Sequence, residues 1–319
     1  MINLFKQLKL PVVTNIEKVN SSQNSVFKVT TLDNTYLVKE YSLDAIKTEK
    51  DLELRTKQIN ISKILNNSGI PTIIPIEFDN EYFVLYNSRY YLIYNYLDYK
   101  TLTQDELSIF HIKTLATTLA ELHKTNLHYE LPIQYRQINI DYDNCLEIFK
   151  NKKETEELYN LMKTNKDKLK GLITDCNDSL EKVEKDLCVS HNDYKLKNIL
   201  WHDEKIYLID FDASALSNPV VSTLESAFAL SIQNKKLNEQ YYKIYLKSYI
   251  ENYGPLKTNF KDALNCSMNG KLQWYEYLLS NYDDPIRIKD SISMTNELLE
   301  FINTKEKQLE IYKDIEYRI

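Results

Sequence analysis

Two linked motifs in the second half of the chain constrain its fold and chemistry more than any other feature. The first reads His191-x-Asp193 and has Asn198 five residues after the aspartate, and an apolar run then leads to Asp210-x-Asp212. Phosphoryl transfer requires a carboxylate that orients the attacking hydroxyl, together with oxygen ligands for Mg²⁺, and this pattern supplies both. The alternative interpretation is a polar loop and turn that carry acids by chance. The apolar runs that flank both motifs argue for the functional interpretation.

These motifs resemble the catalytic loop and metal-binding strand of the aminoglycoside phosphotransferase and choline kinase superfamily, whose fold resembles that of protein kinases. Protein kinases typically carry glycine where this chain has Asp212, and no Ala-Pro-Glu segment follows, so the resemblance favours small-molecule kinases. It implies that Asp193 is the catalytic base and that Asn198 and Asp210 bind Mg²⁺. For Asp212 it leaves two roles open, a further metal ligand or a residue that holds the end of the strand.

The resemblance implies an α+β, two-lobed, protein-kinase-like fold. A β-rich N-terminal lobe over residues 1–97 would bind the nucleotide, and a mainly helical lobe over residues 98–319 would carry the catalytic loop and the acceptor. The hydrophobic pattern agrees with this order. It predicts strands over 16–19, 25–31, 35–41 and, in two or three pieces, 73–97, and helices over 46–66, 110–123, much of 150–187 and most of the chain after 221.

Lys39 stands at the end of the third predicted strand, where the resemblance implies a lysine that contacts the α- and β-phosphates of ATP or GTP. The turn before the second strand, residues 20–25, lies where the family covers the phosphates. It contains Asn24 and Ser25 but lacks the usual glycines. Backbone amides of such a turn can still bind phosphate. The alternative for Lys39 is a strand lysine that faces solvent.

Two further features of the nucleotide site follow from the resemblance. The hinge, Tyr94, Asn95, Tyr96 and Leu97, would hold the base through backbone groups, while ordinary strand packing also explains its tyrosines. A helix glutamate would pair with Lys39, and the two ways of counting disagree. The distance from Lys39 favours Glu53 over Glu49, whereas the helix face that contains Leu65 points to Gln58; the candidates are Glu53, Glu49 and Gln58.

The catalytic loop and its surroundings allow two more expectations. His191 is predicted to brace the loop through a hydrogen bond rather than to act as the base. Relatives often have an aspartate shortly after Pro219, where this chain has Val220 to Glu225, so the contact that braces the loop is expected to be replaced or lost.

The C-terminal helices are expected to form the acceptor site, and here two interpretations compete. Acids close to aromatic residues would suit a small cation that bears a hydroxyl. Alternatively the same segment is a buried helix face with a solvated acidic side. The acids are Glu276, Asp283 and Asp284, and the proposed helix face is Trp274, Tyr277, Leu278 and Leu279.

The composition limits the remaining options. A net charge of −6, from 40 basic and 46 acidic residues, argues against a nucleic-acid partner. Four separated cysteines without a C-x-x-C pair, no signal peptide at the N-terminus and no long apolar run indicate a cytoplasmic protein without a membrane span. Three classes stay open: a small-molecule kinase, an unusual protein kinase, and a non-catalytic binding or structural module with this fold.

Overall fold

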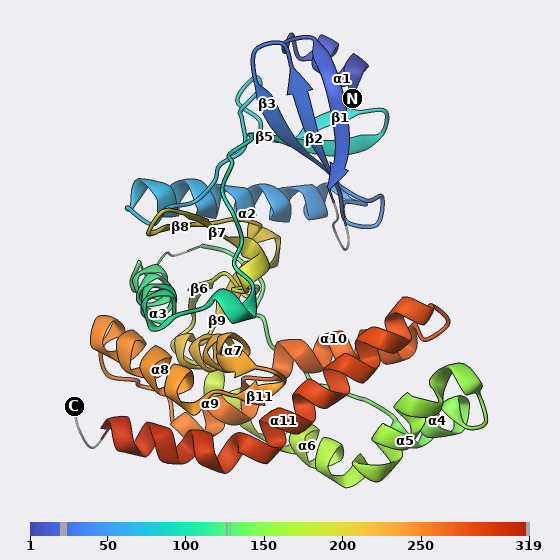
Figure 1. Cartoon of the computed structure of the whole chain (residues 1–319), viewed down its shortest axis with the longest axis vertical. Coiled ribbons are helices and arrows are strands. Elements are labelled where there is room, and N and C mark those ends of the chain that lie inside the picture. Colours follow the sequence, from blue (N-terminus) through green and yellow to red (C-terminus); the bar gives the residue numbers. More distant parts are fainter. Residues whose placement is uncertain (20–23, 126, 128, 317–319) are drawn as a thin grey trace. The chain divides into compact units, whose positions relative to one another are not determined.

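The computed structural model describes residues 1–19, 24–125, 127 and 129–316 (Figure 1). The chain forms two compact units, one comprising Met1–Leu102 with Lys197–Ser214 and the other Thr103–Leu196 with Ala215–Ile319. These units are not the predicted lobes, because Lys197–Ser214 packs with the N-terminal segment. The functional division into a nucleotide lobe, 1–97, and an acceptor lobe, 98–319, stays a prediction.

The first unit is built on an antiparallel sheet in the order β1-β2-β3-β5-β4. Its strands are β1 (Val13–Val19), β2 (Ser25–Thr31), β3 (Thr35–Glu40), β4 (Val84–Tyr86) and β5 (Arg89–Asn95). Tyr36 and Val38 pack with Phe5 of helix α1 (Ile2–Gln7) in one core cluster. Because side chains alternate along a strand, Lys39 points to the opposite face. On that face Leu92, the β5 partner of Lys39, packs in a second cluster.

Helix α2 (Glu49–Asn67) begins three residues later than predicted, because Thr48 caps it. The Thr48 hydroxyl accepts a hydrogen bond from the Asp51 amide, and the Asp51 carboxylate accepts one from the Thr48 amide, which completes a capping box. Gly69 follows the helix with a φ of +90°, a left-handed conformation that glycine commonly adopts just after a helix ends. The predicted strands over 73–97 are realised only as β4 and β5.

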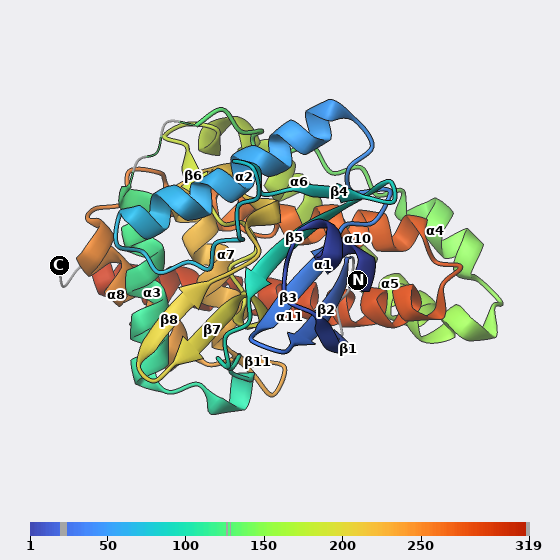
Figure 2. The same cartoon turned by 90° about the horizontal axis from the view of Figure 1, so that it is seen from above.

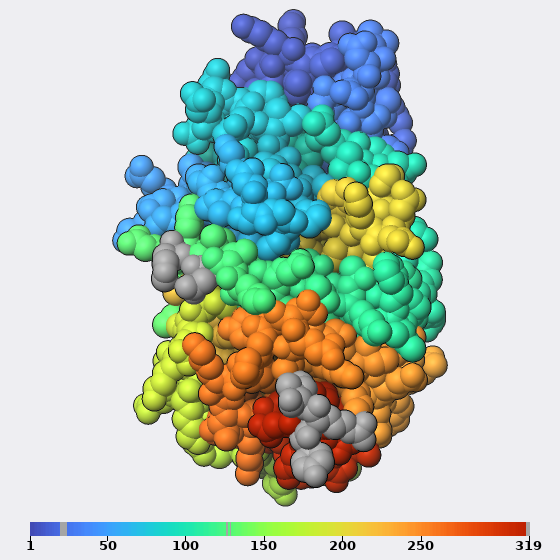
Figure 3. All heavy atoms as spheres, turned by 90° about the vertical axis from the view of Figure 1, so that its left-hand side faces the viewer, coloured from blue at the N-terminus to red at the C-terminus, as the bar shows by residue number. Residues whose placement is uncertain are grey.

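The segment Lys197–Ser214 joins the first unit through backbone pairing. It contains the hairpin β7 (Ile199–His202) and β8 (Lys205–Leu208). Leu208 pairs with Thr72, and Trp201 pairs with Lys100. Figure 3 shows this segment, in yellow, beside α2, in light blue, on the same face of the molecule. The hairpin therefore delivers the Asp210-x-Asp212 motif to α2 and the sheet.

The second unit is mainly helical, and its short antiparallel strands β6 (Cys188–Ser190) and β9 (Ala215–Ser217) include the strand that precedes the loop with Asp193. Helices α10 and α11 pack side by side (Figures 1 and 2). None of the helices in the described part of the chain has both the length and the apolar character needed to cross a bilayer. The helices are α3 (Ile109–Lys124), α4 (Tyr142–Phe149), α5 (Glu156–Thr164), α6 (Lys166–Val183), α7 (Pro219–Ser231), α8 (Glu239–Tyr253), α9 (Phe260–Cys266), α10 (Asn269–Ser280) and α11 (Pro285–Glu316); a further small pair of strands is β10 (Ile232–Gln233) and β11 (Lys236–Leu237).

Candidate active site

Lys39 is the charged centre of a cluster in the first unit. Its ammonium nitrogen Nζ lies 2.8 Å from Asp210 Oδ1 and 2.8 Å from Asp212 Oδ2, and its side chain is only 11% exposed. Burial acts to lower the pKa of Lys39, but the charges of Asp212 and Asp210 outweigh it and raise that pKa. The ammonium is therefore held in its charged form. This geometry excludes the alternative of a strand lysine that simply faces solvent.

The two aspartates converge on Lys39 because the chain turns sharply after β8. Asp210 has a φ of +62°, in the left-handed region that aspartate tolerates better than most residues. The 3-10 turn Phe211–Ala213 follows and brings Asp212 to the same ammonium. Asp212 Oδ1 also accepts a hydrogen bond of 2.7 Å from the hydroxyl of Tyr41. Asp212 is thus fixed by two donors, and its side chain is half as exposed as that of Asp210, at 20% against 41%.

Helix α2 contacts the turn rather than Lys39, which corrects the expected helix partner. Glu53 pairs with Lys57 at 3.0 Å and is 64% exposed. Gln58 instead donates a hydrogen bond to the Ser214 carbonyl at 3.0 Å. Arg55, on the same helix, donates one to the Asp212 carbonyl at 2.5 Å.

Within the described residues, the acids that pair with Lys39 are Asp210 and Asp212 alone. Glu49 is exposed at the start of α2, so none of the three candidates takes the predicted role. The physical reason is that α2 presents an arginine and an amide to the backbone of the turn. It stabilises the turn, and the turn supplies the carboxylates.

The third predicted metal ligand lies at the base of the same hairpin. Asn198 is buried, and its backbone carbonyl accepts a hydrogen bond of 3.0 Å from the backbone amide of Ile209, the residue before Asp210. In the part of the chain that the structure describes, no three His, Cys, Asp or Glu side chains group as a metal site. Two carboxylates and an amide nevertheless fit Mg²⁺, which takes its other ligands from phosphate and water. The convergence of Asp210 and Asp212 on one ammonium shows that they can share a cation.

The residues predicted at the phosphate-covering turn lie at the same end of the sheet as Lys39. Ser25 pairs with Glu40 and begins β2. Asn24 Oδ1 accepts a hydrogen bond of 3.3 Å from the Ser42 amide, which ties the turn to the chain that follows β3. The rest of the predicted turn, residues 20–23, lies outside the described residues.

The predicted hinge is the end of β5 and the chain after it. Tyr94 pairs with Leu37, so it shares the Lys39 face of the sheet. Burial, and then the negative charges of Asp212 and Asp210, raise the pKa of the Tyr94 hydroxyl well above its usual range. Asn95 is exposed and Leu97 half-buried, while the ring of Tyr96 is covered by Lys28 at 4.2 Å. Of these four residues, Tyr94 is the one whose side chain the structure places near the aspartates.

In the second unit, the loop after β6 presents Asp193 together with a lysine. Lys195 Nζ lies 2.7 Å from Asp193 Oδ1, and the Lys195 amide donates to the Asp193 carbonyl at 2.9 Å in a tight turn. The buried His191 accepts a hydrogen bond of 3.3 Å from the Asp193 amide through Nδ1. His191 therefore braces the loop, as predicted.

The loop is further supported by a buried hydrogen-bonded chain. Ser222 on α7 lies 2.7 Å from Ser190, hydroxyl to hydroxyl, which ties α7 to the strand before the loop. Ser190 Oγ lies 3.1 Å from His123 Nε2, and His123 Nδ1 lies 2.7 Å from the Tyr249 hydroxyl. Burial lowers the pKa of His123 to about 3, so its imidazole is neutral. These hydrogen bonds support the loop from α3, α7 and α8 without an aspartate among them.

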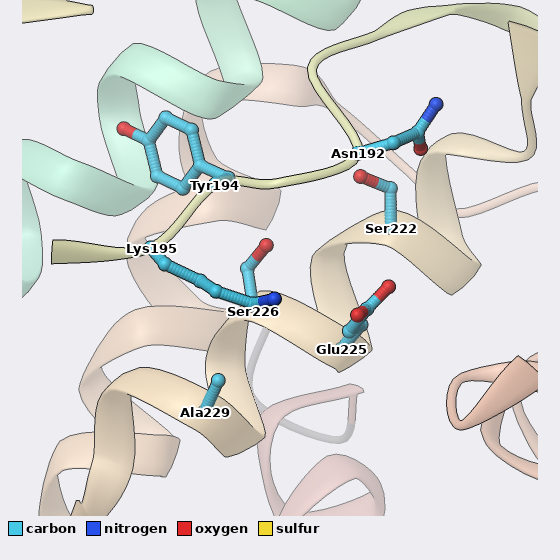
Figure 4. A pocket seen from close by; sticks show the side chains of 7 residues that line it. All are labelled: Asn192, Tyr194, Lys195, Ser222, Glu225, Ser226 and Ala229. Atoms are coloured by element: carbon cyan, nitrogen blue, oxygen red, sulfur yellow. The ribbon is translucent and has the colours of Figure 1, made fainter. Parts of the chain in front are cut away.

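A pocket lies beside Asp193 in the second unit. Figure 4 shows α7 along one side of it and the catalytic loop along the other. The side chain of Lys195 extends from the loop toward α7, and Glu225 projects from the helix. The pocket is lined by Asn192, Tyr194, Lys195, Ser222, Glu225, Ser226 and Ala229.

The predicted acceptor surface on α10 is already supplied with partners from the chain itself. Glu276 pairs with Arg136 at 2.5 Å. Arg287 lies over the rings of both Trp274 and Tyr277, at 5.4 Å from each ring. Leu278 and Leu279 are buried, whereas Tyr277 is 44% exposed, so the predicted buried face is only partly formed. The same arginine is within 3.9 Å of Asp284, while Asp283 is exposed.

Three residues of these clusters, Lys195, Tyr41 and Arg55, were not predicted from the sequence. Lys195 follows Asp193 by two residues, a spacing at which side chains of an extended segment point the same way. Tyr41 and Arg55 act across more than 150 residues of sequence, so only the fold reveals their contacts with Asp212.

Together these clusters and the α+β architecture define a kinase-like phosphotransferase. A family model described as the phosphotransferase enzyme family matches residues 15–252, and the chain belongs to this family. It is a small-molecule phosphotransferase enzyme. No protein of curated function matches the sequence.

Solved structures with this fold are numerous and distant in sequence. The spectinomycin phosphotransferase APH(9)-Ia, in complex with ADP and spectinomycin, has a TM-score of 0.69 at 16% identity, with 95% of this chain and 98% of that one covered. The amicoumacin kinase hAmiN, with AMP-PNP, Ca²⁺ and its ligand, has a TM-score of 0.60 at 12% identity, covering 89% and 87%. The choline kinase LicA from Streptococcus pneumoniae has a TM-score of 0.58 at 14% identity, covering 95% and 98%. At these identities the likeness establishes the fold.

Proposed function

We propose that the protein transfers the γ-phosphoryl group of ATP to a hydroxyl of a small molecule. The observation that carries the proposal is the position of Lys39, a buried ammonium 2.8 Å from each of Asp210 and Asp212. Polyphosphate binding with a divalent cation needs a fixed positive charge next to oxygen ligands, and this cluster supplies both. Structures with the same fold hold ADP or AMP-PNP, which supports a nucleotide as the ligand.

In this proposal the first unit holds the nucleotide. Lys39 contacts the α- and β-phosphates, and the Tyr94 to Leu97 segment holds the base. Asp210 and Asn198 bind Mg²⁺, with Asp212 as a third candidate ligand whose position is fixed by Tyr41. When bound, Mg²⁺ neutralises charge on the phosphates.

The second unit carries out the proton transfer. Asp193 accepts the proton of the acceptor hydroxyl while the new oxygen–phosphorus bond forms and the bond from the γ-phosphorus to the β-phosphate oxygen breaks, which releases ADP. Lys195 pairs with Asp193 at Oδ1 and so helps to fix the position of this carboxylate. The neutral, buried His123 and Ser222 keep the loop in place without exchanging protons.

The acceptor is a small hydroxyl-bearing molecule, and we propose that it carries a positive charge. The solved relatives named above bind spectinomycin or amicoumacin or are described as choline kinases, and the first and last of these names denote amine-bearing acceptors. A neutral sugar or a hydroxylated amino acid is the competing class. No nucleic-acid acceptor is proposed, because the net charge is negative.

A coupled assay of ADP release tests the proposal. Purified protein with Mg²⁺ and ATP, and separately GTP, is screened against amino alcohols, aminoglycosides, neutral sugars and homoserine-like acceptors, with generic protein substrates alongside. We expect turnover of at least one small acceptor above the rate without acceptor. Turnover of proteins only, or metal-independent nucleotide binding without any turnover, contradicts it and favours a protein-directed kinase or a non-catalytic module.

A further inference from the structure

Two charged residues, Lys195 and Glu225, line the pocket beside Asp193. Lys195 pairs with Asp193 at 2.7 Å, and the buried Lys271 pairs with Glu297 at 2.6 Å. Glu225 interacts with these charges only at longer range. Among the described residues, none donates an ion pair or a hydrogen bond to the Glu225 carboxylate. Both ammonium groups near Glu225 are thus paired with other carboxylates.

The direction of Glu225 makes this carboxylate a feature of the pocket. It projects from α7, whose neighbouring Ser222 and Ser226 also line the pocket (Figure 4). The residue is half-buried, so its charge is only partly screened by water. Helix α10 passes close by, and a Cβ at Gly270 would lie 3.8 Å and 3.9 Å from the two carboxylate oxygens. The backbone of α10 thus closes one side of the space around the carboxylate.

We propose that Glu225 binds the cationic nitrogen of the acceptor, a protonated amine or a quaternary ammonium, and selects such acceptors over neutral ones. This assignment rests on the proposed function, and it replaces the acids of α10 as the source of cation recognition. A monovalent cation in the pocket would pair with the Glu225 carboxylate. Because Lys195 lies beside both Asp193 and Glu225, the hydroxyl that reacts and the amine that is bound belong to the same small molecule.

The electrostatics of the site agree with this role. Burial raises the pKa of the Glu225 carboxyl, against the lowering effect of Lys271 and then Lys195. A carboxylate that is costly to ionise, and that has no partner of its own, gains more from a bound cation than one already paired. By contrast Glu276 already has Arg136 at 2.5 Å.

The test compares Glu225→Gln with two other substitutions that each remove one negative charge. Glu276→Gln removes the acid of the competing surface, and Asp178→Asn removes an exposed charge on α6. The acceptors are ethanolamine, choline and spectinomycin, with ethylene glycol as the neutral counterpart of ethanolamine. Glu225→Gln is expected to raise KM for the amine-bearing acceptors at least tenfold with a much smaller change in kcat. The values for the neutral acceptor, and all values for Asp178→Asn, stay within about twofold.

The outcomes separate this inference from the proposed function. If the wild type phosphorylates acceptors but Glu225→Gln leaves the preference for amines unchanged, or Glu276→Gln alone removes it, the role of Glu225 is wrong and the kinase stands. If the wild type phosphorylates none of the wider panel of acceptors, the proposed function fails. Calorimetric titration of spectinomycin and choline into the same variants then decides the binding role. A tenfold weaker affinity in Glu225→Gln supports it, and equal affinity overturns it.

Discussion

The two charged clusters of this protein differ in how completely their charges are matched. In the first unit, Lys39 is paired with both Asp210 and Asp212, and Asp212 has a further donor in Tyr41. In the second unit, Lys195 pairs with Asp193, but no residue in the described part of the chain forms an ion pair with Glu225. We interpret the matched cluster as the part that serves a ligand shared by all kinases, the polyphosphate. In the unmatched cluster, the charge of Glu225 is left to bind the acceptor, which is the ligand that differs between family members.

The largest expected effect separates chemistry from nucleotide binding. Asp193→Asn removes the proton acceptor and the charge beside Lys195, so we expect kcat to fall by roughly 10²–10⁴-fold. The affinity for Mg²⁺-ATP, measured by calorimetry, should change by less than about threefold, because the phosphate ligands are assigned to the other cluster.

Asp178→Asn is the matched control for that loss of charge, and it should retain the wild-type rate. A variant Asp193→Asn with wild-type kcat would assign the base elsewhere. A parallel loss of nucleotide affinity would instead show that the two clusters cannot be treated separately.

The next effect concerns the matched cluster. Asp210→Ala removes a proposed Mg²⁺ ligand and leaves Lys39 with Asp212 alone. We expect the gain in ATP affinity that Mg²⁺ gives to disappear, which calorimetry with and without the metal measures directly. Asp212→Asn sharpens the test, because it keeps the shape and removes one charge. If Asp212→Asn loses as much of the Mg²⁺-dependent gain in ATP affinity as Asp210→Ala does, Asp212 is a metal ligand. If it loses only folding stability, Asp212 is a support for the turn.

The sequence predicted the matched cluster far better than the unmatched one. Asp210, Asp212 and Lys39 were found because strand ends and a short motif fix them locally. Their mutual contact spans more than 170 residues of sequence and was not predicted, because a helix residue was expected to pair with Lys39. The sequence failed at α2, because the order of its charges does not tell which face meets the turn. Asp210 and Asp212 took the place expected for Glu53, while Arg55 and Gln58 contact the backbone of the turn.

The acceptor side was less predictable for a physical reason. Acids on a helix surface look alike in sequence whether they are solvated, paired or aimed into a pocket. Glu276 attracted the prediction, but Arg136 lies against it. Glu225 lies in a largely apolar helix segment, and its importance depends on Lys195 and Lys271 finding other partners. Whether an acid is left for a ligand depends on which charged residues pair in the folded chain, and the periodicity of the sequence does not predict that pairing.

A third effect tests whether the support of the catalytic loop belongs to the fold or to the chemistry. His123 has a pKa of about 3 when buried in the folded protein. The unfolded value is about 6.5, so the folded state binds fewer protons and loses stability as the pH falls below 6.5. Between pH 7.5 and pH 5 this loss should amount to roughly 2 kcal/mol.

Urea unfolding at the two pH values, for the wild type and for His123→Gln, measures this loss. The variant keeps hydrogen-bonding groups for Ser190 and Tyr249 but cannot titrate, so its stability should depend less on pH. An identical pH dependence in both proteins would mean that His123 is not buried in its neutral form.

The smallest effect asks whether Glu225 acts through its charge or through the shape of the pocket. A Cβ at Gly270 would lie 3.3 Å from Gln134 Nε2, the end of a flexible side chain, and in ordinary contact with the Glu225 oxygens at 3.8 Å and 3.9 Å. Gly270→Ala is therefore expected to change KM for an amine-bearing acceptor by less than about threefold. Its free energy of unfolding should rise by less than the gain of about 1 kcal/mol for alanine inside a helix, because the amide of Gln134 must shift.

Gly171→Ala is the matched control, because a Cβ at this position on α6 meets no atom within 4 Å. Gly171→Ala should show the full gain of about 1 kcal/mol in the free energy of unfolding and no change in KM. A tenfold rise of KM in Gly270→Ala would mean that the pocket selects by shape, and the contrast drawn between a matched and an unmatched cluster would lose its basis.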